Sequence, residues 1–236
     1  MRVTQDVPRI NKEEEMKMKK NLYAITVLAV LVGLALIGVQ GAQADVTVKY
    51  KMASDRGIFY QVLRYADKQH VRQDMYDGNK LMSTMLKLGD KVYMISDGLA
   101  IEISSALGSM GSSMLKSMMG DNKPQAVRFE PTGRSENIAG IRGEVYRVII
   151  NGEPHEVVLG RNRSLFEAVQ GSVELAKGMM GKSAANRLMK QIDRDSSRKG
   201  MAMLRFDHSM EVVSVKSGRI PDAVFALPGN GAGASR

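Results

Sequence analysis

Residues 69–103 read QHVRQDMYDGNKLMSTMLKLGDKVYMISDGLAIEI, and they give the clearest indication of the fold. Short glycine-aspartate dipeptides divide it into four runs of strand-like sequence, at 69–76, 81–88, 92–96 and 99–103. The dividers Asp77-Gly78 and Asp97-Gly98 are of the kind that tight hairpin turns prefer. Apolar and polar residues alternate over 69–76, as in a half-buried strand. The stretch therefore predicts a meander of antiparallel strands.

The flanking sequence extends this pattern in both directions. Upstream, residues 46–52 alternate, while residues 57–66 are apolar on both faces and are expected to be covered twice. Downstream, Asn151-Gly152 joins two strand-like runs into a hairpin. The runs predicted as strands in the second half of the chain are 125–130, 144–150, 153–159, 201–206 and 210–216.

Helical periodicity interrupts the strands twice. Residues 106–119 carry apolar side chains at helical spacing, although Gly108 and Gly111 weaken a helix there. A second helix is predicted to begin with a capping box from Ser164 to Glu167. The apolar face of this helix comprises Leu165, Val169, Val173, Ala176 and Met180. Gly181 is expected to end it, and Ser183 to cap a further helix whose apolar stripe contains Leu188 and Ile192.

The order of these elements resembles the LolA/LolB-like lipoprotein-carrier superfamily, and more closely a group of exported bacterial proteins of unknown function near it. The phrases that carry the resemblance are Ala66–Met75 with Leu88–Met94, Asn137–Gly140 leading into Glu144–Arg147, and Ile220–Pro228. The resemblance implies a mainly β (α+β) domain, in which a curved antiparallel sheet or incomplete β-barrel has helices over its concave face. No functional residue of the carriers matches a position of this chain.

The first 44 residues predict export. Basic residues at 17–20 precede an uncharged apolar run over 22–39, and Ala42-Gln43-Ala44 is the small-residue pattern that signal peptidase cleaves. We expect a signal peptide at 16–44, cleaved after Ala44, and a periplasmic protein; an uncleaved membrane anchor is the alternative. Residues 1–15 are interpreted as a mis-assigned N-terminal extension, 45–228 as a single domain, and 229–236 as a disordered tail.

Composition narrows the classes of function. The whole chain carries a net charge of +9, and the 192 residues after Ala44 retain +7 without a block of like charge. That distribution does not indicate a nucleic-acid footprint, whereas anionic lipid head groups or a partner protein are compatible with it. The chain contains no cysteine, which excludes thiol catalysis and an acyl anchor on cysteine.

Methionine is the unusual residue, with 18 in the chain. Its flexible, polarisable side chain suits an apolar groove that adapts to acyl chains, but the same residues could simply fill a core or bind Cu(I). The residues predicted to line a ligand groove are Phe59, Leu63, Tyr65, Leu107, Met110, Met114, Met118, Met179 and Met180.

Signatures of catalysis are missing from the sequence. His70, His155 and His208 are too far apart in the chain to form a local metal pair, and no Gly-x-Ser-x-Gly elbow or phosphate loop occurs. No catalytic residue, metal ligand or cofactor is assigned. The sequence predicts a non-enzymatic carrier for a lipid or a lipoprotein acyl chain, with peripheral membrane contact allowed. The alternatives are an envelope protein-interaction or sensory module and a methionine-based copper binder.

Overall fold

The computed structural model describes residues 45–55, 57–103, 129–150, 152–180 and 200–229, without the side chains of Met179 and Met180. Several predictions lie outside these residues and stay predictions. They are the extension at 1–15, the signal peptide at 16–44, the helix at 106–119, the start of the strand at 125–128, the helix after Gly181, and the tail from 230.

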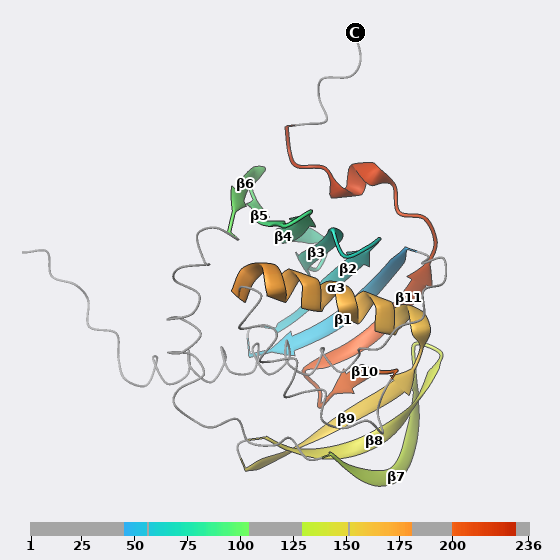
Figure 1. The fold of residues 1–236 in the computed structure, drawn as a ribbon. Helices are drawn as coiled ribbons and strands as arrows, with labels where there is room; N and C mark the ends of the chain where they lie inside the picture. Colours follow the sequence, from blue (N-terminus) through green and yellow to red (C-terminus); the bar gives the residue numbers. More distant parts are fainter. Residues whose placement is uncertain (1–44, 56, 104–128, 151, 181–199, 230–236) are drawn as a thin grey trace, which may run out of the picture.

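The described residues form one open antiparallel sheet of eleven strands with a helix across it (Figure 1). The strand order is β6-β5-β4-β3-β2-β1-β11-β10-β9-β8-β7, so the first and last strands are neighbours in the middle of the sheet. The strands are β1 Val46–Ser54, β2 Gly57–Tyr65, β3 His70–Asp77, β4 Lys80–Leu88, β5 Lys91–Ser96, β6 Leu99–Glu102, β7 Phe129–Ile138, β8 Ile141–Ile150, β9 Glu153–Arg161, β10 Met201–Phe206 and β11 Met210–Ser217. This architecture confirms the coarse prediction of a mainly β domain with an unclosed sheet.

The turn predicted at Asp97-Gly98 lies where this dipeptide placed it. The turn predicted at Asp77-Gly78 is shifted by one residue, because Asp77 pairs with Lys80 and leaves Gly78 and Asn79 between them. Asp97 and Gly98 both adopt positive φ angles, of 51° and 76°, and they join β5 to β6 in a two-residue turn. Ala139 and Gly140, which the sequence pattern does not predict as a turn, do the same between β7 and β8, with φ angles of 52° and 79°. Positive φ at both central residues matches the right-handed twist of the flanking strands. Local turn chemistry therefore fixes the order of the hairpins.

Strand β7 differs from the prediction. It continues through Pro131 to Ile138, whereas the sequence pattern predicts a strand that stops at residue 130. Its register against β8 shifts between Pro131 and Ser135, which marks a bulge. Proline lacks the N–H group that a central strand needs, but β7 is at one end of the sheet, where a bulged strand tolerates it.

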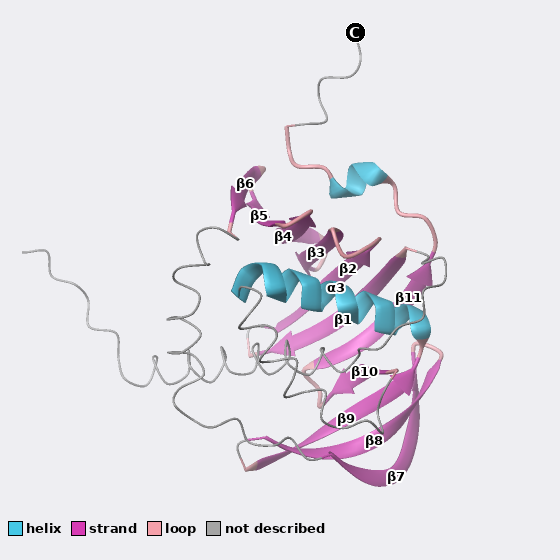
Figure 2. Cartoon of the chain, in the orientation of Figure 1, coloured by secondary structure: helices cyan, strands magenta, loops and turns pink. Residues whose placement is uncertain are grey.

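Helix α3 (Arg163–Met180) lies across the strands on one face, called here the helix-side face, and the opposite face is called the outer face (Figure 2). The predicted capping box is wrong. Asn162 caps the helix instead, because its Oδ1 accepts the Leu165 N–H at 2.8 Å. Ser164 Oγ lies 2.6 Å from Ser217 Oγ, and Glu167 pairs with Arg163 at 2.9 Å.

Two glycines set the close approach of α3 to the sheet. A Cβ atom at Gly171 would lie 2.7 Å from Tyr65 Cδ2, and one at Gly178 would lie 2.2 Å from Val92 Cγ2. Both distances are too short for a side-chain carbon, so these positions require glycine although glycine disfavours a helix. Tyr65 and Val92 are buried beneath the helix.

Replacing Gly171 with alanine is therefore expected to destabilise the protein, although the same change stabilises an ordinary helix by about 1 kcal/mol. Overpacking against buried Tyr65 costs about 1–3 kcal/mol. We expect a melting temperature lower by about 3–5 °C in thermal unfolding. Ser172→Ala, which adds no atom at the contact, is the control and should change little. A higher melting temperature for Gly171→Ala would show that the helix does not lie this close to the sheet.

The C-terminal segment folds back over the outer face, which the sequence pattern does not predict. Residues 220–228, called here the C-terminal strap, include the short 3-10 helix η2 (Asp222–Phe225). Ile220 and Phe225 of the strap are buried in a small cluster with Leu86 of β4. Asp45 Oδ2 accepts the Ile220 N–H at 2.6 Å and so ties the start of the strap to the start of β1. The strap covers β3–β5 on the face opposite α3.

Candidate functional site

An apolar row on the helix-side face of β4–β6 is the feature of the described residues that a ligand could use. Val92 of β5 is fully buried beneath Gly178 near the end of α3. Met94 points to the same face because residues two apart in a strand do so. Met94 is paired directly with Met85 of β4 and with Ile101 of β6, and Leu99 is paired with Ser96.

Exposure rises along this row with distance from α3. Met94 is 43% exposed, Ile101 62% and Leu99 70%, whereas Met85 is partly buried against the core. These four residues are called here the apolar row. Single exposed apolar side chains are ordinary, but a contiguous row that extends the core face of a sheet is typical of a binding surface.

The predicted groove residues are not all brought together. Leu63 and Tyr65 are buried beneath α3, so they form the core floor of the helix-side face. Phe59 is partly buried and packs against the same core. Leu107, Met110, Met114 and Met118 lie outside the described residues, as do the side chains of Met179 and Met180, so their assignment stays a prediction.

The sequence pattern does not predict the apolar row as a ligand site. Met94, Leu99 and Ile101 were recognised as strand residues, but the periodicity of a strand does not show whether a helix covers it. The available signal was the short run after Asp97-Gly98, because β6 follows the last turn of the meander and ends the sheet. A terminal strand with Leu and Ile on one face exposes them unless another segment packs there.

A buried charge network lies on the outer face, beneath the strap. Asp74 of β3 is 1% exposed and accepts hydrogen bonds from Arg72 Nε at 2.9 Å, from Thr84 Oγ1 at 2.5 Å and from Arg64. Arg72 also donates to the Val224 carbonyl oxygen of the strap at 2.8 Å. The Asp74 carboxylate thus pairs with the guanidinium groups of Arg64 and Arg72, and it holds Arg72 toward the strap. This role is structural.

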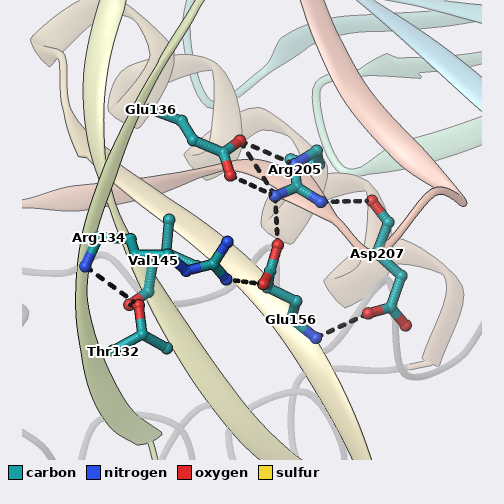
Figure 3. Close-up of polar contacts among 7 residues, drawn as sticks. All are labelled: Thr132, Arg134, Glu136, Val145, Glu156, Arg205 and Asp207. Atoms are coloured by element: carbon teal, nitrogen blue, oxygen red, sulfur yellow. Dashed lines mark hydrogen bonds and ion pairs between the residues drawn. The ribbon is translucent and has the colours of Figure 1, made fainter.

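A second network joins β7, β9 and β10 (Figure 3). Arg205 Nη2 lies 2.9 Å from Glu136 and 2.5 Å from Glu156, and Nη1 donates to the Asp207 carbonyl at 3.0 Å. Arg134 pairs with the same Glu156. The hydrogen bond from Arg205, with that from Arg134, lowers the pKa of Glu156 although burial opposes this. Burial alone would lower the pKa of Arg205, but the two carboxylates raise it.

The histidines serve turns and strand packing. His70 lies 3.0 Å from Asp67, and its ring contacts Phe225 of the strap edge-on at 5.8 Å. Burial raises the pKa of Asp67, but hydrogen bonds from His70 and from backbone N–H groups lower it overall. His155 stacks on Phe206 at 5.2 Å and bonds to Asp207 at 2.7 Å. Among the described residues, no three His, Cys, Asp or Glu side chains are grouped to hold a metal ion.

No described helix is long and apolar enough to cross a membrane.

The chain was compared with family models, with curated proteins and with solved structures. No family model and none of the curated proteins matches the chain. Among solved structures, the crystal structure of a LolA superfamily protein from Nitrosomonas europaea is similar at 11% sequence identity and a TM-score of 0.30. The match covers 86% of this chain and 97% of that one.

Proposed function

We propose that the protein is a non-enzymatic carrier of an apolar ligand, such as a lipid or the acyl chain of a lipoprotein, and that it acts in the periplasm. The observation that carries the proposal is the apolar row. Met94, Ile101 and Leu99 continue the core face of the sheet beyond the end of α3 and remain exposed there. An acyl chain laid along the row would remove these side chains from water.

Hydrophobic burial is sufficient to supply the affinity. Fully burying a leucine, isoleucine or methionine side chain contributes about 1.5–3 kcal/mol, and roughly half of that surface is still available at each exposed position. The polar side chains on the same face of β3–β5 include Gln73, Ser83 and Ser96, which could bind a head group. Lys87 of β4 lies on this face too, but it is buried and donates to the carbonyl oxygens of Lys68 and Gly89. The chemistry of this face is therefore suited to binding.

A charge in the row should weaken acyl binding without unfolding the sheet. Ile101→Asp places a carboxylate where an acyl chain would bury it, and burying an unpaired charge is costly. We expect at least a tenfold loss of affinity for a fluorescent fatty acid, measured by titration, while the melting temperature changes by less than about 2 °C because the site is exposed. Ile149→Asp, at a second exposed isoleucine on β8, is the matched control and should bind normally. Unchanged affinity in folded Ile101→Asp protein would exclude the row as the ligand site.

The protein-interaction alternative has one observation in its favour. Strand β6 is an edge strand whose Leu99, Ala100 and Ile101 are all exposed, and such an edge can pair with a strand of another protein. In that case Ile101→Asp would leave fatty-acid binding unchanged and abolish capture of the partner.

The copper alternative can be tested at the same place. Met85 and Met94 are directly opposite each other on β4 and β5, and thioethers bind Cu(I). Met94→Leu keeps volume and apolarity, so acyl affinity should stay within about twofold. A Cu(I) titration that lost a site in this variant would instead favour the copper binder.

Localisation is tested by N-terminal processing. Because Ala42-Gln43-Ala44 fits signal peptidase, the exported protein is expected to begin at Asp45. This position suits the fold, since Asp45 already bonds to the backbone of Gly218 and Ile220 next to β1. Intact-mass measurement of protein from the periplasmic fraction checks the expectation. A product that retains residues 22–39 in the membrane would favour the anchored alternative.

A further inference from the structure

The outer face of the central strands carries a patch of lysines that the proposed ligand site does not use. Lys49 and Lys51 of β1 and Lys216 of β11 lie on this face, opposite the buried side of β1. Tyr60 and Ile58 of β2 lie beside them, because Lys51 is paired with Tyr60 and Ala53 with Ile58. These five residues are called here the lysine face.

Both charged and apolar side chains of the lysine face are exposed to solvent. Lys51 and Lys216 are exposed, and neither forms an ion pair with a described acid. Lys49 Nζ lies 4.3 Å from the centre of the Tyr60 ring, and Ile58 is 52% exposed. On the neighbouring strand the one acid that faces these lysines is Glu211, paired with Lys51 across β1 and β11. The C-terminal strap contacts β3, β4 and β5, beyond β2, and leaves this patch uncovered.

The composition of the patch distinguishes between two kinds of acidic partner. Protein interfaces are depleted of lysine and enriched in arginine. Lysine, with its long apolar stem and mobile ammonium group, suits a diffuse anionic surface, and tyrosine suits the boundary between water and lipid. A lone exposed isoleucine beside them can enter the head-group layer. The patch lies on central strands, so no free edge is present there to add a partner strand.

We propose that the lysine face docks the protein onto the surface of an anionic phospholipid bilayer. The interaction is electrostatic and reversible, with each lysine near the surface contributing about a fivefold increase in affinity and the three together about a hundredfold. This site is on the opposite face of the sheet from the apolar row, and the inference does not depend on acyl-chain binding. If the carrier function and the membrane docking are both correct, one face of the sheet binds the ligand and the opposite face binds the membrane.

The test compares two triple variants of the whole chain in co-sedimentation with vesicles. Lys49→Glu/Lys51→Glu/Lys216→Glu removes the patch. Lys68→Glu/Lys80→Glu/Arg142→Glu changes net charge equally at exposed cations elsewhere. Vesicles of phosphatidylcholine with 30% phosphatidylglycerol, and of phosphatidylcholine alone, are used at about 50 and 300 mM salt. Intact mass verifies that the N-terminus is the same in every protein, and fatty-acid titration is run in parallel.

We expect the original chain and the control triple to bind anionic vesicles at low salt and to dissociate at high salt. The patch triple, which reverses three charges, should lose at least about a hundredfold in affinity while keeping its fatty-acid affinity and melting temperature. Equal vesicle binding by the two triples, or binding that ignores lipid charge, would overturn the proposal. No binding of the original chain to anionic vesicles would also overturn it and leave an acidic protein as the partner. Normal vesicle docking with failed fatty-acid binding would refute the carrier function alone.

Discussion

Replacing Asp74 with alanine is expected to lower the melting temperature by about 10 °C. Among the described residues, this is the largest effect that we expect from removing one charged side chain. The carboxylate is buried and bonded to Arg64, Arg72 and Thr84. Breaking a buried ion pair by removing one partner typically costs 3–5 kcal/mol, because the other charge is left uncompensated. For a chain of this size each kcal/mol corresponds to about 2–4 °C.

The same substitution should also loosen the C-terminal strap. Arg72 holds the Val224 carbonyl while Asp74 holds Arg72, so loss of the carboxylate frees the guanidinium from its position. Hydrogen exchange over residues 220–228 is therefore expected to speed up more than exchange in β8, which is remote from the strap. Asp77→Ala, at an exposed aspartate of the same strand, is the control and should change both readings little. A melting temperature within 2 °C of the original for Asp74→Ala would contradict the role given to this network.

Removing Arg205 is expected to have the second largest effect on stability, about 1–3 kcal/mol at neutral pH, because it leaves Glu136 and Glu156 close together without their shared cation. Partial exposure of both carboxylates keeps the effect below that of Asp74. Arg205→Lys retains the charge but cannot bind two carboxylates with a planar fork, so its melting temperature should fall between those of the original and Arg205→Ala.

The effect of Arg205→Ala should depend on pH in a definite direction. Arg205 lowers the pKa of Glu156 below its ordinary value of 4.5. A carboxylate whose pKa is lowered by folding adds stability above that ordinary value and loses it as the pH falls through the lowered one. The original protein thus loses this contribution in acid, whereas the variant never has it. The difference in melting temperature should be full at pH 7 and should shrink as the pH falls below 4.5. A difference that grew on acidification would contradict the assigned pairing.

Local sequence determines much of this fold, and particular residues show why. Asp97 and Gly98 adopt the backbone angles of a tight turn, so the dipeptide alone places β5 against β6. Strand alternation in β1 likewise indicates its buried side. These features depend on neighbouring residues in the chain. They explain why the hairpins and the boundaries of most strands could be predicted from sequence.

Features that depend on distant contacts were missed. Val46 is paired with Ser217, and no local pattern indicates that the ends of the domain meet in the middle of the sheet. Gly171 reads as a weak helix position until Tyr65 is placed beneath it. Asp74 reads as one polar residue in an alternating strand. Its burial follows from the strap, whose contact with Arg72 spans 152 positions of sequence.

The candidate site divides in the same way. Phe59, Leu63 and Tyr65 were correctly placed on one face of β2, but α3 buries the last two and leaves them as core. Exposure at Met94, Leu99 and Ile101 depends on where α3 ends above the sheet and on β6 being its last strand. Neither is visible in the residues themselves, so the row could be found only in the structure.

Photo-crosslinking with a diazirine-labelled fatty acid would show where on the protein an acyl chain binds. After irradiation and digestion, mass spectrometry locates the labelled residues. We expect labels in the described part of the chain to concentrate on residues 91–103, chiefly at Met94, Leu99 and Ile101, and to disappear when unlabelled fatty acid is added in excess. Labels spread over the outer face of β1–β3, or labelling that excess unlabelled fatty acid leaves unchanged, would contradict the proposal that the apolar row binds the ligand.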